Sequence, residues 1–179
     1  MSSTTPDPTQ PEFSRTVRLD EIGRIHWPVH VVAEEGERRG LARRFGYSSM
    51  GRLEADYRLS RDGSTLTTTG KIVAELSQPC VATGEPVPET VHEDFAIRFV
   101  PEEQLETHHA DEEVELDAQE CDLLPYTGNR IDIGEAIAET LALAVSPYPR
   151  SANADAWLRE AGFGLGASRW QTIQRAVLP

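Results

Sequence analysis

The chain has 179 residues, of which 39% are apolar and 26% charged, and its 17 basic and 30 acidic side chains give a formal net charge of −13. This length suits one domain that buries roughly 70% of its unfolded surface and needs neither a disulfide nor a metal to fold. The composition excludes collagen, a coiled coil and a wholly disordered chain, and no apolar run approaches the ~20 residues that cross a bilayer. The first residues lack the basic and apolar parts of a signal peptide, so we expect a cytoplasmic protein without membrane contact.

The chain begins with a segment that has little to bury. Residues 1–12 are rich in Ser, Thr and Pro, which predicts a disordered tail before a single domain over residues 13–150. Alternating apolar residues then predict two short strands, one around Val17 and Leu19 and one over residues 27–31.

Residues 34–45 change to a helical period. Acidic residues come first and arginines last, which suits the helix dipole, so we expect an amphipathic helix that ends near Gly46. Arg39 and Arg43 are neighbours on such a helix, and Arg44 at its end could hold a phosphate through two hydrogen bonds.

These three arginines are the candidate RNA contacts. A solvated helix face with pairs such as Glu35 to Arg39 is the simpler interpretation, and the sequence leaves both open.

The clearest local pattern is a long β-hairpin. Apolar residues alternate over residues 53–59 and 66–76, and Asp62-Gly63 between the two runs is typical of a hairpin turn. Gly70 falls on the apolar face of the second strand, where a glycine indicates a bulge, a bend or a close backbone approach. A further strand is expected from about residue 89 to residue 100, after a turn-rich connector.

The negative charge is concentrated in one stretch. Between Glu85 and Asp122 there are 14 acidic residues and one basic residue, and the rest of the chain is neutral. Residues 101–122 predict an acidic surface loop with one short strand at most. Such a surface attracts basic proteins, and the candidate partner-binding residues are Glu102, Glu103, Glu106, Asp111, Glu112, Glu113, Glu115 and Asp117.

A second helix opens at Asp132. Glu135 stands three positions later and completes an Asp-x-x-Glu capping pattern, and the apolar stripe that follows ends near Ser146, before two prolines. We expect residues 151–179 to form a C-terminal extension of short helices or partly disordered chain. The order of elements predicts an α+β fold with a mainly antiparallel sheet or partly closed barrel and two principal helices.

The residue types that carry common chemistries lack the required spacing. Cys80 has Thr83, and no second cysteine, at the position that would complete a zinc-ligand pair, and it stands far from Cys121, so we expect no metal, no disulfide and no redox site. No Gly-x-Ser-x-Gly motif is present. We therefore expect no cofactor and no small-molecule substrate, with a hydrolase that uses buried carboxylates as an alternative.

Two stretches resemble the YceD family, also called large ribosomal RNA subunit accumulation proteins. They are residues 70–87 (GKIVAELSQPCVATGEPV) and residues 131–150 (IDIGEAIAETLALAVSPYPR), and residues 11–15 and 37–45 are similar to its alphaproteobacterial branch. The residues at the positions of the family motif are Cys80, Thr83, Glu85, Pro86, Asp132, Glu135 and Glu139. Many relatives carry a second cysteine where this chain has Thr83.

The resemblance implies a bacterial factor without enzymatic activity that is needed for normal 23S ribosomal RNA levels. Its partners would be 23S rRNA or a large-subunit precursor, or a basic large-subunit ribosomal protein. An adaptor protein unrelated to ribosomes is the other alternative that the sequence leaves open.

Overall fold

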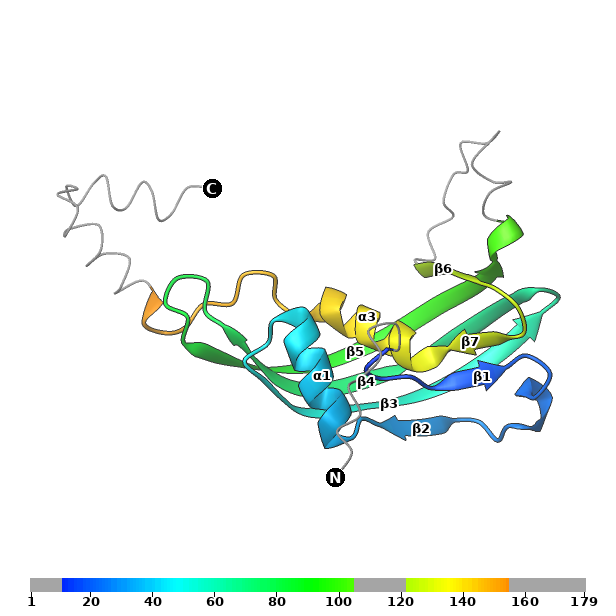
Figure 1. Cartoon of the computed structure of the whole chain (residues 1–179), viewed down its shortest axis with the longest axis horizontal. Coiled ribbons are helices and arrows are strands. Elements are labelled where there is room, and N and C mark those ends of the chain that lie inside the picture. The colour runs from blue at the N-terminus through cyan, green and yellow to red at the C-terminus, as the bar shows by residue number, and fades with distance from the viewer. Residues whose placement is uncertain (1–10, 105–121, 155–179) are drawn as a thin grey trace, which may run out of the picture.

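The computed structural model describes residues 11–104 and 122–154 and is built on a five-stranded sheet in the order β2-β3-β4-β5-β6 (Figure 1). The strands are β2 (Val29–Val32), β3 (Ser49–Asp62), β4 (Thr65–Pro79), β5 (Pro86–Pro101) and β6 (Asp122–Tyr126). A separate antiparallel pair joins β1 (Thr16–Arg18) to β7 (Arg130–Asp132). The helical segments are η1 (Ile22–Arg24), α1 (Glu35–Phe45) and α3 (Ile133–Ala144).

One face of the sheet carries the core. Figure 1 shows α1, α3 and the β1–β7 pair lying over the same face of the five-stranded sheet. Apolar side chains of alternate strand positions point into this layer, among them Leu53, Ile72 and Ile97, each at most 1% exposed. The predicted α+β class is confirmed. The sheet is open and does not close into a barrel.

The predicted hairpin is confirmed as β3 and β4. Asp62 pairs with Thr65, and Gly63 between them has a φ of 59°, a conformation that favours glycine. Gly70 marks a close backbone approach, because a Cβ there would stand 2.3 Å from the Asp56 carbonyl oxygen and 2.8 Å from the Phe95 ring.

Strand β6 pairs in a different direction from the other strands of the mainly antiparallel sheet. β6 runs parallel to β5, with Ile97 opposite Asp122 and Pro101 opposite Tyr126. β6 is the edge strand in the order β2-β3-β4-β5-β6, and its parallel pairing makes the mostly antiparallel sheet a mixed one.

Both predicted helices form. Helix α1 begins after Glu34, whose backbone N–H donates to the Glu37 carboxylate at 2.7 Å, and ends at Gly46, which has a φ of 73°. Helix α3 buries the predicted stripe against the sheet, including Ile137 and Leu141, both 0% exposed. No helix among residues 11–104 and 122–154 is long and apolar enough to cross a membrane.

Candidate functional site

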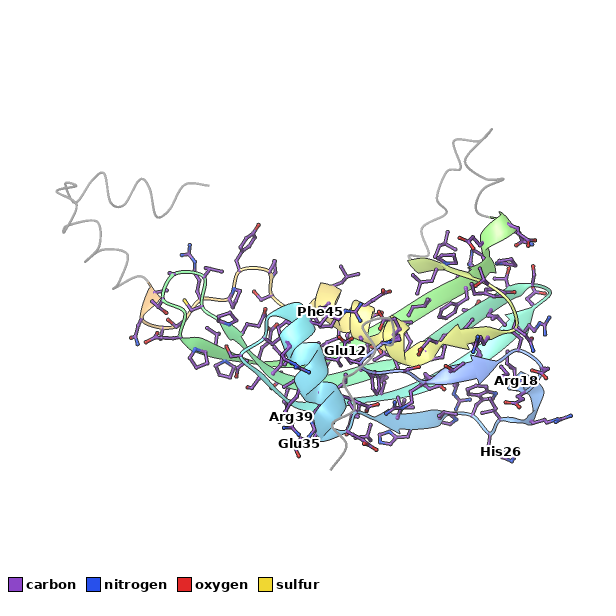
Figure 2. The ribbon with its side chains drawn as sticks, in the orientation of Figure 1. Glu12, Arg18, His26, Glu35, Arg39 and Phe45 are labelled. Carbon is purple, nitrogen blue, oxygen red and sulfur yellow. The ribbon has the colours of Figure 1, made fainter. Side chains whose placement is uncertain are left out.

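Arg39 and Arg43 lie on the solvent face of α1, as the helical spacing predicts. The Arg39 side chain is 72% exposed and stands 3.4 Å from the Glu35 carboxylate, one turn away, and Figure 2 shows the two side by side on α1. Arg43 is exposed and has no acidic partner within 4.0 Å in the described part of the chain. An exposed pair such as Glu35–Arg39 contributes little stability, so both arginines can turn to a ligand at small cost.

Arg44 has a different environment from its two neighbours. Its guanidinium donates to both carboxylate oxygens of Glu135, at 2.6 and 2.9 Å, and to Glu12 at 3.3 Å. These contacts, led by the hydrogen bond to Glu135, raise the pKa of Arg44 above its usual value. Arg44 therefore joins α1 to the first turn of α3, and a phosphate would have to compete with this two-pronged ion pair.

The same ion pair corrects part of the predicted capping pattern. Asp132 does accept the Glu135 N–H at 3.2 Å, as predicted for a helix cap. The Glu135 carboxylate, however, binds Arg44 and not the backbone of Asp132. A glutamate at this position can serve either the helix start or a neighbouring helix, and the nearby arginine offers the stronger, charge-assisted hydrogen bonds.

Asp132 also anchors the segment that precedes β1. One carboxylate oxygen accepts the Arg15 N–H at 2.8 Å, and the other accepts the Ser14 hydroxyl. Arg15 in turn donates to the Glu37 carboxylate at 2.7 and 2.9 Å. The segment around residues 14–15 is thus held to α1 on one side and to α3 on the other.

Replacing Asp132 with alanine is expected to lower the free energy of unfolding by about 2–3 kcal/mol. The variant loses one capping bond and two further bonds to a charged acceptor that is partly buried. Urea denaturation measures the loss. The matched control is Asp94→Ala, which removes only the exposed Lys71–Asp94 pair and should cost less than about 1 kcal/mol. Equal losses in the two variants would contradict the anchoring role of Asp132.

Cys80 lies in a tight turn between β4 and β5. Its N–H donates to the Glu85 carbonyl at 2.7 Å, and its carbonyl accepts from Gly84, whose φ of 74° requires glycine. The Thr83 hydroxyl lies 3.2 Å from the Glu85 carboxylate and 3.3 Å from the Ser151 hydroxyl. The four predicted motif residues of this region thus form one turn, which Pro86 closes as the first residue of β5.

The environment of the Cys80 sulfur favours a thiolate. The Ser151 N–H donates to the sulfur at 3.3 Å. This bond, together with the Thr83 hydroxyl, lowers the pKa of the thiol to about 6 although the residue is only 4% exposed. The described residues include no group of three potential metal ligands, and Cys121 lies outside them, so the absence of zinc and of a disulfide stays a prediction.

The thiolate absorbance of the folded protein is expected to rise around pH 6, and this step should be missing in Cys80→Ser. Because the folded pKa lies below the ordinary thiol value of about 8.5, the stability that Cys80 contributes grows between pH 6 and that value and is lost as the pH falls through 6. The free energy of unfolding, measured by denaturation, should therefore differ more between pH 5.5 and pH 8 in the wild type than in Cys80→Ser. A thiol that titrates near its ordinary value would contradict the assignment.

The described part of the chain contains two of the acidic candidates. Glu102 and Glu103 are exposed and follow directly after β5. The other six lie outside the described residues, and these are Glu106, Asp111, Glu112, Glu113, Glu115 and Asp117.

The predicted motif residues at the end of β7 and on α3 line a groove that the sequence did not predict. It has a volume of about 730 Å³ and lies between β6 on one side and β7 with the start of α3 on the other. Its lining includes Asp132, Glu135 and Glu139 from the end of β7 and from α3, and Leu124 and Tyr126 from β6. The alternation of Leu124 and Tyr126 was the sequence signal for β6, but Pro125 between them obscured it.

A sequence model of the YceD family, described as large ribosomal RNA subunit accumulation protein, matches residues 68–161. The match covers more than half of the chain. The chain belongs to the YceD family. No curated protein and no solved structure gave a match.

The YceD match separates the candidate residues into two groups. The Cys80 turn, the acidic candidates and the groove wall on α3 all lie inside the matched range, whereas the arginines of α1 precede it. The family model therefore covers the Cys80 turn and the part of the groove that β5, β6, β7 and α3 contribute, but not Pro11, Ser14 and Thr16, which also line the groove.

Proposed function

We propose that this protein supports the accumulation of large-subunit ribosomal RNA by binding 23S rRNA or a large-subunit precursor, together with a basic ribosomal protein. The observation that carries the proposal is membership of the YceD family, whose description names large ribosomal RNA subunit accumulation. A factor of this kind is expected to act in the cytoplasm, where ribosomal precursors are assembled.

The charges of the chain support a division between two surfaces. Arg39 and Arg43 are exposed cations on α1 and suit contact with phosphate. The acidic stretch that includes Glu102 and Glu103 repels RNA and attracts basic protein. Together they let one molecule hold an RNA and a cationic protein at separate places.

Two of the carboxylates that line the groove are already held by hydrogen-bond donors of the protein itself. A hydrolase needs a carboxyl group that is free to exchange a proton with a substrate. Asp132 is occupied by three hydrogen bonds, and Glu135 is bound to Arg44. These two groups hold the fold together, so neither is free to exchange a proton with a substrate.

The proposal is tested by sedimentation of cell extracts in sucrose gradients. The wild-type protein should comigrate with large-subunit precursors at low salt and be released as salt rises, because phosphate contacts weaken with ionic strength. The double variant Arg39→Glu with Arg43→Glu should be released at lower salt. The control Arg24→Glu with Arg61→Glu makes the same charge change on η1 and at the hairpin end of β3.

Free migration of the wild type at every salt concentration would contradict the proposed function. If the two double variants lose comigration at the same salt concentration, the total charge of the protein, and not the α1 surface, determines binding.

A further inference from the structure

The groove beside α3 continues into a second hollow. Tyr126 and Thr127 line both the 730 Å³ groove and a neighbouring hollow of about 470 Å³, which Pro101, Glu102 and Glu103 bound on its far side. The two hollows adjoin at these shared residues, and together, as one depression, they are lined by residues from the end of β5, from β6 and from the first turns of α3. Residues far apart in sequence thus share one surface.

Both apolar and acidic side chains line this depression. Buried Phe99 and Ile131, each 3% exposed, line it together with Leu124 and Tyr126. The acidic side chains along it are Glu102, Glu103, Asp132, Glu135 and Glu139. Among the described residues that line it, Arg130 is the one basic side chain.

The acidic side chains of the depression differ in whether a hydrogen-bond donor or a cation of the protein already compensates their negative charge. Asp132 is surrounded by hydrogen-bond donors, and Glu135 is paired with Arg44. Glu139, one turn further along α3, has no ion-pair partner within 4.0 Å among residues 11–104 and 122–154. Desolvation and the nearby Glu135 charge raise its pKa, while Arg44 acts in the opposite direction. A cation placed beside Glu139 would relieve this unfavourable charge.

The free edge of β6 does not suit an added strand. Pro125 lies in the middle of the strand and lacks a backbone N–H, and a proline is a common protection of sheet edges. A ligand here would therefore be recognised by its side chains in the depression rather than through backbone ladders.

We propose that this depression, lined by Tyr126, Thr127 and Glu139 and bounded by Glu102, binds an extended polypeptide segment rich in lysine or arginine. The aliphatic stem of a basic side chain packs on Leu124 and Tyr126 while its charged end lies beside Glu139. A nucleic acid would bring its phosphates against Glu139, which no cation of the described residues balances, and this disfavours a nucleic acid at this place. The identification of the occupant as a ribosomal protein rests on the proposed function, whereas the depression and its preference for cations do not.

The test uses a fluorescein-labelled decapeptide of alternating arginine and leucine and measures its dissociation constant by fluorescence anisotropy with the full chain. The double variant Glu102→Gln with Glu139→Gln should bind about tenfold more weakly at 0.15 M salt, since it removes two charges next to the bound cations. The control Glu75→Gln with Asp94→Asn makes the same charge change at exposed positions of β4 and β5 and should weaken binding less than about twofold.

A second variant tests shape without changing charge. Thr127 is exposed and lines both hollows, so Thr127→Trp should fill the depression and weaken peptide binding by about tenfold while the fold is kept, as circular dichroism would verify.

Equal weakening in the groove and control variants would overturn the proposal, because general attraction to an acidic protein would then explain binding. Binding of an RNA oligonucleotide that Thr127→Trp abolishes would overturn it as well. If the protein binds the peptide but does not comigrate with large-subunit precursors, the proposed function is contradicted. The depression then remains a binding site for basic segments.

Discussion

Replacing Leu141 with alanine is expected to lower the free energy of unfolding by about 2–5 kcal/mol. Leu141 is 0% exposed and lies in the stripe of α3 that packs on β4 and β5. The substitution removes three buried carbon atoms and leaves a cavity that the surrounding sheet can fill only in part. Urea denaturation monitored by circular dichroism measures the effect.

The same helix offers a matched control. Leu143 stands two positions further on and is 80% exposed, so Leu143→Ala makes the identical chemical change outside the core and should alter stability by less than about 0.5 kcal/mol. If Leu141→Ala proved as mild as Leu143→Ala, the orientation of α3 on the sheet would be wrong.

Replacing Gly70 with alanine is expected to cost about 3 kcal/mol or more, although alanine normally stabilises a strand relative to glycine. The new methyl group would stand 2.3 Å from the Asp56 carbonyl oxygen and 2.8 Å from the Phe95 ring, so β3 or β5 must move away from β4. Thermal and urea denaturation would both report the loss.

Gly51 provides the comparison within the same sheet. A Cβ at this position would meet its nearest neighbour, the Glu75 carbonyl oxygen, at an ordinary 3.7 Å. Gly51→Ala should therefore be neutral or stabilise the protein by up to about 1 kcal/mol. A Gly70→Ala protein as stable as Gly51→Ala would show that the three central strands are not packed as closely as described.

The elements that the sequence predicted are those whose determinants are local. The β3–β4 hairpin follows from period-two alternation around Asp62-Gly63, and α3 follows from a cap at Asp132 and an apolar stripe. In each case neighbours along the chain both define the element and form it. The bounds were accurate to within a few residues for the same reason.

The parallel strand β6 could not be predicted in this way. It is five residues long and contains Pro125. It pairs with residues 97–101, which stand before the acidic loop in the sequence, whereas β6 stands after it. Such pairing depends on a distant partner and not on a local pattern.

The different roles of the α1 arginines also could not be predicted from the sequence. Arg39 and Arg44 belong to one cluster along the chain, yet the two acidic partners of Arg44 stand 32 and 91 positions away from it. Only the fold, which places α1 and α3 on the same face of the sheet, brings Glu135 within reach of Arg44. The depression at Tyr126 was missed for the same reason, because its lining comes from segments that only the fold brings together.

Crosslinking in cells, followed by identification of both the RNA and the protein partners, tests the central claim most directly. Binding to large-subunit precursors predicts that 23S rRNA and a lysine- or arginine-rich large-subunit protein are recovered together. Arg39→Glu with Arg43→Glu should lower the RNA yield, and Glu102→Gln with Glu139→Gln should lower the protein yield. Recovery of neither partner above the level of an unrelated acidic protein would contradict the account.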